Sequence, residues 1–194
     1  MLGRVGRIIR VVTVGMALVL TGTGCTRAAA GAPRRELRPA PAQTVVPRSA
    51  EAAGGACLLM NFADASTATG LDLAVSAAGD SGTTSTCVLR QMAAPLPDLT
   101  LSVSPTVADP AVFPSAVAPK GASAVGALGK AGYSRPLAAP ATAAGPGVEV
   151  GWLSGDQRLF VLRYRSRPGT PAADVAAVTA NLVELAKKVD TTAS

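Results

Sequence analysis

The chain has 194 residues, enough for one domain with accessory segments. Phe, Trp and Tyr together number only six, so a core must be built mainly from Val, Leu and Ala. The net charge of +6 comes from residues 1–50, which hold eight Arg and one Glu, whereas residues 51–194 hold ten Lys or Arg and eleven Asp or Glu. This distribution excludes the basic surface expected of a nucleic-acid-binding domain, so no nucleic acid is expected among the partners.

The first segment has the three-part layout of an export signal. It begins with three basic residues, Arg4, Arg7 and Arg10. An apolar run over residues 11–20 and the small residues 21–24 follow, and they lead to Cys25. The apolar run has about half of the roughly 20 residues that a membrane-spanning helix needs, so a permanent span is the weaker alternative. We therefore predict a signal peptide over residues 1–24.

Gly24-Cys25 resembles the end of a bacterial lipobox, in which the cysteine receives diacylglycerol and becomes the first residue of the mature protein. The resemblance implies that Cys25 carries acyl chains of the palmitate type, which anchor the protein to the extracytoplasmic face of the cell membrane. An ordinary secretory signal with an incidental cysteine is the alternative. Residues 26–53 mix Pro, Ala and Arg without apolar periodicity, so residues 25–53 are predicted to be the lipidated cysteine and a flexible tether.

The other two cysteines fall inside the predicted extracytoplasmic domain, residues 54–190. An exported chain meets an oxidising compartment, so Cys57 and Cys87 are expected to form a disulfide, which leaves no unpaired thiol if Cys25 is lipidated. The bridge would close a loop of about 31 residues and stabilise the fold by roughly 3 to 4 kcal/mol.

The first half of this domain predicts a helix and three strands. A short helix is expected near residues 58–69, with Asn61 as its cap and Gly70 as its stop. Alternating apolar residues over 71–77 predict a strand, which ends in the turn-rich residues 79–82.

Residues 84–92 are the predicted return strand of a hairpin. Pro95 to Asp98 are expected to break the chain before a third strand, in which Leu99, Leu101 and Val103 alternate with polar residues. The three strands would form a meander.

The second half predicts a hairpin and a helix. Residues 109–119 are expected to hold a short helix, and the Pro-, Gly- and Ala-rich chain up to Pro146 is expected to be mostly loop. Alternating residues from Val148 to Trp152 and from Phe160 to Tyr164 predict two strands, joined by a turn over 154–157.

A final helix is predicted to open at Thr170-Pro171, with the Thr170 hydroxyl as its cap, and to reach Lys187-Lys188. Its apolar stripe recurs at steps of three and four and comprises Val175, Val178, Leu182, Leu185 and Val189. The stripe is expected to cover the sheet rather than to form a coiled coil. The fold class is thus α+β, an antiparallel sheet of about five strands packed by a short N-terminal helix and a C-terminal helix.

Several of these features together resemble a known actinobacterial lipoprotein family, that of domain of unknown function 3558. They are the lipobox, the tether, Cys57-Leu58-Leu59 at the start of a helix, Cys87 in a strand, and residues 125–131 (VGALGKA). The resemblance spans residues 55–189, and it implies the location and an α+β fold. It implies no catalytic residue. A receptor-kinase sensor-like exported domain is the alternative.

Few motifs in the sequence could carry catalysis or ligand binding. The chain has no histidine, so Ser-His-Asp and Cys-His mechanisms are excluded. The glycine-rich residues 126–132 are expected to be a turn rather than a phosphate loop, since no Ser or Thr follows Lys130. Arg163, Arg165 and Arg167 are interpreted as a solvated stripe on an edge strand, with contact to anionic lipid or wall polymer as the alternative.

The aromatic residues Tyr133, Trp152, Phe160 and Tyr164 are interpreted as core, with the lining of an apolar pocket as the alternative. The sequence therefore predicts no catalytic residue, no cofactor-binding residue and no metal ligand, and hence a non-enzymatic binding or interaction module at the cell envelope. Its expected partners are the membrane, through the lipid anchor, and an envelope protein or lipid. The alternative is a small lipid or glycolipid carrier with an apolar pocket.

Overall fold

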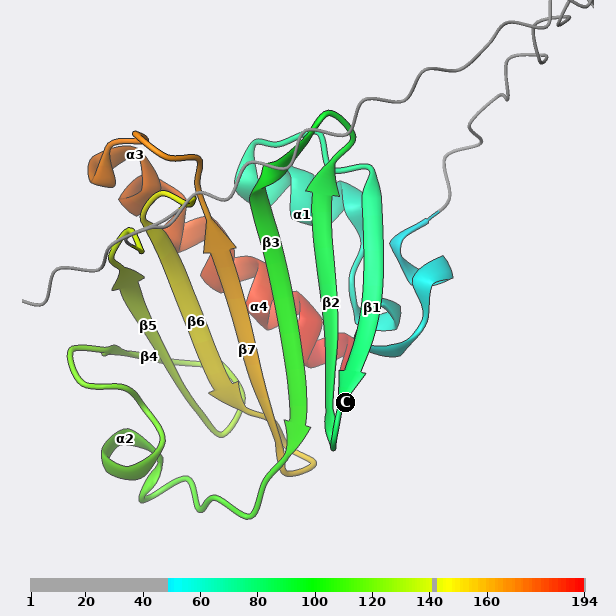
Figure 1. Ribbon diagram of the computed structural model, residues 1–194. Helices are drawn as coiled ribbons and strands as arrows, with labels where there is room; N and C mark the ends of the chain where they lie inside the picture. The colour runs from blue at the N-terminus through cyan, green and yellow to red at the C-terminus, as the bar shows by residue number, and fades with distance from the viewer. Residues whose placement is uncertain (1–48, 141–142, 194) are drawn as a thin grey trace, which may run out of the picture. The chain divides into compact units, whose positions relative to one another are not determined.

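The computed structural model describes residues 49–140 and 143–193, which form one antiparallel sheet with its main helices on one face (Figure 1). The predicted signal peptide, Cys25 and most of the predicted tether lie outside these residues. Seven strands are present in the described part: β1 (Val75–Ser81), β2 (Thr84–Gln91), β3 (Ala94–Pro105), β4 (Ser123–Val125), β5 (Ala131–Leu137), β6 (Gly147–Leu153) and β7 (Arg158–Arg165). Their order across the sheet is β1-β2-β3-β7-β6-β5-β4. The α+β class is confirmed, but the expectation of about five strands was wrong.

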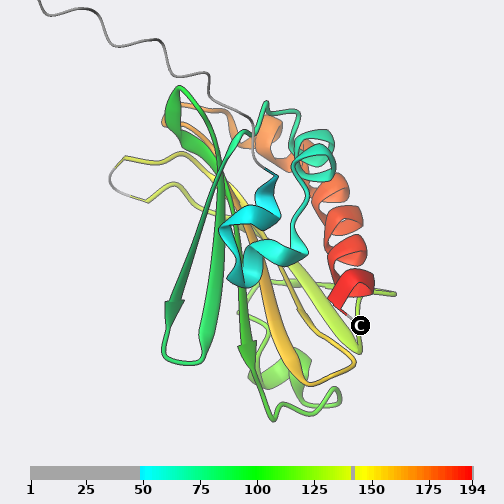
Figure 2. The same cartoon turned by 90° about the vertical axis from the view of Figure 1, so that its right-hand side faces the viewer.

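The main helices form a second layer, which Figure 2 shows edge-on beside the sheet. They are the short 3-10 helices η1 (Ala50–Ala53) and η2 (Gly55–Leu59) and the α-helices α1 (Phe62–Thr69), α3 (Ala172–Ala177) and α4 (Thr179–Ala193). The short helix α2 (Phe113–Ala116) lies on the other face, where Phe113 packs with Tyr133 and Leu153 in a separate small cluster. The main core lies between the sheet and the layer of η1, η2, α1, α3 and α4. Ala50 is fully buried in this core, so the folded part already includes the last residues of the predicted tether.

Helix α1 starts at Phe62 rather than at residue 58, because the Asn61 side chain caps it. Asn61 Oδ1 accepts hydrogen bonds from the backbone N–H groups of Ala63 (2.8 Å) and Asp64 (3.4 Å). Gly70 ends the helix in the left-handed conformation, with φ of 69°, as its position predicted.

The meander β1-β2-β3 is confirmed, although its boundaries differ from the prediction. β1 begins at Val75, because Leu73 is buried beneath the sheet and its backbone N–H is bonded to Ser66 Oγ (3.3 Å). The expected break at residues 95–98 does not end the strand, since β3 already begins at Ala94, but it does interrupt the pairing with β2. The β2-β3 register shifts between Arg90 and Gln91, which leaves residues 95–97 out of the ladder and so tolerates two prolines.

Strands β4 and β5 fall where the sequence predicted mostly loop. In β5 only Tyr133 and Leu137 are buried, and Gly132 and Pro136 interrupt the apolar alternation. Pro136 is tolerated because β4 pairs only with residues 132–134, so this part of β5 is a free edge. The short helix α2 lies within residues 109–119, as expected.

The β6-β7 hairpin is confirmed, with Val150 opposite Leu162 at its centre. The C-terminal helix was expected to be continuous, but it divides at Val178 into α3 and α4. The expected Thr170 cap was wrong, because its hydroxyl donates to the Arg167 carbonyl (2.9 Å) instead of capping α3. The buried members of the apolar stripe nevertheless face the sheet: Val175, Leu182, Leu185 and Val189.

Cys57 in η2 and Cys87 in β2 lie at disulfide distance, with their Cα atoms 4.9 Å apart. Both are fully buried in the main core. The pair joins the helical layer to the sheet.

Candidate functional site

The face of the sheet turned away from the main helices carries a cluster of charged side chains. The cluster lies at the end where β2, β5 and β7 finish, which is uppermost in Figure 1, whereas α2 lies near the opposite end. We call it the arginine patch, and it comprises Arg90, Asp98, Arg135, Glu149, Arg163 and Arg165. The strand register places its members in two cross-strand rows, Arg90–Asp98–Arg165 and Arg163–Glu149–Arg135.

Glu149 is the centre of the second row and is 2% exposed. Its carboxylate accepts hydrogen bonds from Arg135 Nε (2.8 Å), Arg163 Nη2 (2.6 Å) and the Tyr133 hydroxyl (3.0 Å). Burial alone would raise the pKa of Glu149, but the hydrogen bonds from Arg135 and Arg163 outweigh it and hold the pKa below its usual value of 4.5. Glu149 is therefore an ionised, saturated acceptor that fixes two guanidinium groups on the sheet.

Tyr133 reaches Glu149 because Gly151 leaves room for its ring. A Cβ atom at Gly151 would lie 2.6 Å from the Tyr133 hydroxyl oxygen, so any other residue at this position would displace the ring. Burial and the neighbouring Glu149 raise the pKa of Tyr133, so the hydroxyl keeps its proton and remains a donor.

Asp98 sits in the first row between Arg90 and Arg165. Burial raises the pKa of this carboxyl, and the charges of Arg90 and Arg165 only partly offset that effect. Among the described residues the Arg90 guanidinium makes no hydrogen bond or ion pair, and neither Nη atom of Arg135 makes one. The patch therefore presents charged N–H donors that no side chain of the described fold uses.

The charge of the patch differs from that of the rest of the domain. Four cations and two carboxylates give the patch a net charge of +2, whereas the other charged residues of 51–194 sum to −3. This asymmetry arises although the domain as a whole is nearly neutral, and it creates a local positive potential on one face.

The three arginines identified from the sequence lie close together, but not on an edge strand. β7 is an interior strand between β3 and β6, so the interpretation of Arg163 and Arg165 as an edge stripe was wrong. The pattern could not show this, because strand order depends on residues distant in sequence. Arg167 donates to the Leu96 carbonyl (3.0 Å) and to Gln91 Oε1 (3.1 Å), and so ties the end of β7 to the β2-β3 bulge.

An apolar groove of about 830 Å³ borders the patch, between α3, the end of β5 and the start of β6. We call it the α3 groove. Leu137, Val148 and Val175 form its buried part, and exposed small residues such as Ala172 and Ala176 stand at its rim. Its further lining residues are Ser123, Ser134, Arg135, Pro136, Ala138, Ala139, Pro146, Gly147, Thr170 and Thr179. Arg135 belongs to both the patch and the groove.

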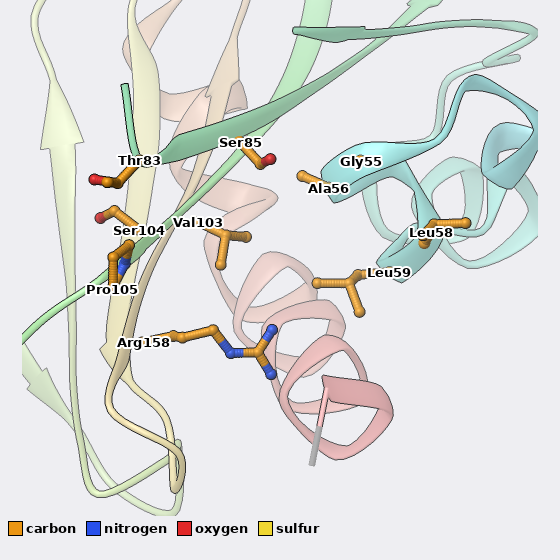
Figure 3. A pocket seen from close by; sticks show the side chains of 10 residues that line it. All are labelled: Gly55, Ala56, Leu58, Leu59, Thr83, Ser85, Val103, Ser104, Pro105 and Arg158. Carbon is orange, nitrogen blue, oxygen red and sulfur yellow. The ribbon is translucent and has the colours of Figure 1, made fainter. Parts of the chain in front are cut away.

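A second pocket, of about 350 Å³, lies below η2 near the opposite end of the sheet (Figure 3). Its cation, Arg158, points toward α4, where Nη2 donates to the Ala193 carbonyl (2.6 Å), and it also pairs with Asp156. Because this guanidinium already has protein partners, the pocket offers fewer available hydrogen-bond donors to a ligand than the arginine patch does.

The aromatic residues and the glycine-rich segment that the sequence singled out have structural roles. Trp152 and Phe160 stack in the main core with ring centroids 4.9 Å apart, and Tyr164 is buried in the same core. Residues 126–130 form the turn between β4 and β5. Among residues 49–140 and 143–193, no three Cys, Asp or Glu side chains gather as metal ligands would. No helix of the same residues has the length and hydropathy to cross a bilayer.

No protein-family model matches the chain, and no similar protein was found among the curated proteins or the solved structures.

Proposed function

We propose that the protein is an exported lipoprotein, anchored through Cys25 to the extracytoplasmic face of the cell membrane, and that its domain is a non-enzymatic module that binds an anionic envelope molecule. The resemblance of residues 55–189 to the lipoprotein family of domain of unknown function 3558 supports the location. The arginine patch supports the binding role, because it combines a net charge of +2 with uncommitted guanidinium N–H donors.

The chemistry of the patch favours binding over catalysis. Glu149 is ionised and accepts hydrogen bonds from three side chains, so its oxygens are occupied by positioning Arg135 and Arg163 rather than free to exchange a proton with a substrate. Arginine stays protonated and presents planar donor pairs that match phosphate and carboxylate oxygens. The ligand class is therefore a phosphate- or carboxylate-bearing molecule. The second candidate function, carriage of a small lipid or glycolipid, is favoured by the volume and apolar lining of the α3 groove.

The patch is tested with tripolyphosphate as the probe and the full chain carrying Cys25→Ser. We expect binding that weakens as salt is added, since exposed charges are screened. Arg90→Gln is expected to weaken binding about fivefold, the scale of one exposed ionic contact. Asp98→Asn is expected to strengthen it, because it removes a carboxylate from between two arginines. Isothermal titration calorimetry measures both.

Lys187→Gln is the matched control, since it removes one positive charge from α4, on the other side of the sheet. If Arg90→Gln and Lys187→Gln weaken binding equally, the probe responds only to overall charge and the patch is not the binding site. If Asp98→Asn leaves binding unchanged, the probe does not bind near this carboxylate, which also contradicts binding at the patch.

The anchor is tested separately by cell fractionation. Two acyl chains bind a membrane stably, at about 0.8 kcal/mol per buried methylene, so Cys25→Ala is expected to move the protein from the membrane to the soluble fraction. Cys57→Ala, which alters a cysteine inside the domain, is the control and is expected to stay with the membrane. An unchanged membrane fraction for Cys25→Ala would contradict lipidation at this residue.

A further inference from the structure

We propose that the α3 groove holds the acyl chain of an anionic membrane lipid whose headgroup lies on Arg135 and Arg165. This inference rests on the proposed function, since it takes the arginine patch as an anion-binding surface and adds an apolar subsite to it. The ligand is then an amphiphile, with a charged and an apolar part recognised by two adjoining surfaces.

The groove suits an apolar chain in size and lining. Its volume of about 830 Å³ lies within the range of about 300 to 1,000 Å³ that is typical of small-molecule sites. Leu137, Val148 and Val175 give its buried part aliphatic side chains from the sheet and from α3. Ala172 and Ala176 are exposed at the rim, so their small side chains leave the groove accessible from solvent.

The two arginines meet the groove at its boundary with the charged face. Arg135 lines the groove while its Nε is fixed by Glu149, which leaves its Nη atoms without a partner among the described residues. Arg165 donates from Nη1 to the carbonyl of Ala138, which also lines the groove (2.8 Å). A headgroup anion at this boundary would face two positive charges while its chain lay in the groove.

The edge of the sheet makes the two surfaces continuous. β4 pairs with residues 132–134 of β5 and no further, so Arg135, Pro136 and Leu137 have no neighbouring strand on that side. Arg135 and Leu137 point toward the charged face, and Pro136 lies between them on the helix side, so one ligand can contact both faces around this uncovered edge.

The test compares three probes. 1-Palmitoyl-lysophosphatidylglycerol has an acyl chain and a net negative charge, 1-palmitoyl-lysophosphatidylcholine has the chain but no net charge, and glycerol 1-phosphate has the charge but no chain. They are titrated as monomers into the full chain carrying Cys25→Ser. We expect the anionic lysolipid to bind at least about tenfold more tightly than either of the others, because only it has both the acyl chain and an unbalanced negative charge. Arg165→Gln is expected to reduce the ratio of the affinity for the anionic lysolipid to the affinity for the zwitterionic one.

Two alanine variants of α3 separate groove filling from general effects. Ala176→Phe places a ring in the groove and is expected to weaken binding of the anionic lysolipid at least about tenfold. Ala173→Phe puts the same side chain on the same helix, at an exposed position that does not line the groove, and is expected to leave binding unchanged.

Equal affinity of these two variants for the anionic lysolipid would overturn the inference. An anionic lysolipid that binds no more tightly than glycerol 1-phosphate would also overturn it. In that case, tripolyphosphate binding that is still weakened by Arg90→Gln would leave the proposed anion-binding function standing without the acyl-chain subsite. A change in sedimentation between Ala176→Phe and Ala173→Phe without lipid would instead assign the groove to contact between copies of the chain.

Discussion

Glu149 links the stability of the domain to pH. Its pKa is held below the ordinary value, so its ionised form stabilises the fold at neutral pH, and this contribution is lost as the pH falls through the lower pKa of the folded state. Glu149→Gln removes the charge but keeps the shape. We expect it to lower the free energy of unfolding by about 2 kcal/mol at pH 7, because hydrogen bonds to a charged group are replaced by neutral ones.

Urea unfolding of both proteins, at pH 7 and at the lowest pH where both remain folded, measures this effect. The difference between the two proteins is expected to shrink at the lower pH, where Glu149 itself becomes protonated. The side chains of Arg163 and Arg135 are 46% and 30% exposed, so water can replace the carboxylate as their hydrogen-bond partner. The substitution therefore costs less free energy than breaking a fully buried ion pair would. A difference that is equal at both pH values would contradict the role of the ionised carboxylate.

Among the elements, α1 depends on its cap. Asn61 satisfies two backbone N–H groups that the first turn leaves without helical partners, so Asn61→Ala is expected to lower the free energy of unfolding by about 1 kcal/mol. Asn61→Asp keeps a capping oxygen and is the control. Thermal unfolding followed by circular dichroism distinguishes them, and equal melting temperatures for both variants would show that the cap contributes nothing measurable.

The elements also show how far local sequence patterns reach. β6, β7 and the inner part of β3 were predicted because apolar residues alternate along them, and that alternation depends only on neighbouring residues. β5 was missed because Gly132 and Pro136 interrupt its pattern, and its pairing depends on β6 and on a short partner strand. The bulge that admits Pro95 and Pro97 into β3 likewise depends on the register of β2.

The site was predicted less completely than the fold. The sequence singled out Arg163 and Arg165 from their spacing, but it gave no reason to connect them to Glu149 or Arg135, which lie on other strands. One signal was present: a glutamate in the apolar strand 147–153, with a glycine two residues away on each side, indicates a charge that neighbouring side chains cover. Finding those neighbours requires the strand order.

At the scale of the whole molecule, the Cys57–Cys87 pair connects the helical layer to the sheet. Cross-linking a loop of this length restricts the unfolded chain and stabilises the fold by roughly 3 to 4 kcal/mol. Reduction is therefore expected to lower the melting temperature by several degrees, as measured by calorimetry with and without a reductant. The double variant Cys57→Ala/Cys87→Ala should not respond to the reductant, and two free thiols in the native protein would refute the bridge.

The uncovered end of β5 also affects edge-to-edge association between copies of the chain. A bare strand edge is a template for a second strand, and edges of this kind promote aggregation. Here Pro136 offers no backbone N–H to an incoming strand, and Arg135 next to it repels its own counterpart on another copy. The same short stretch that we propose admits a ligand around the sheet therefore discourages neighbouring molecules from joining their sheets.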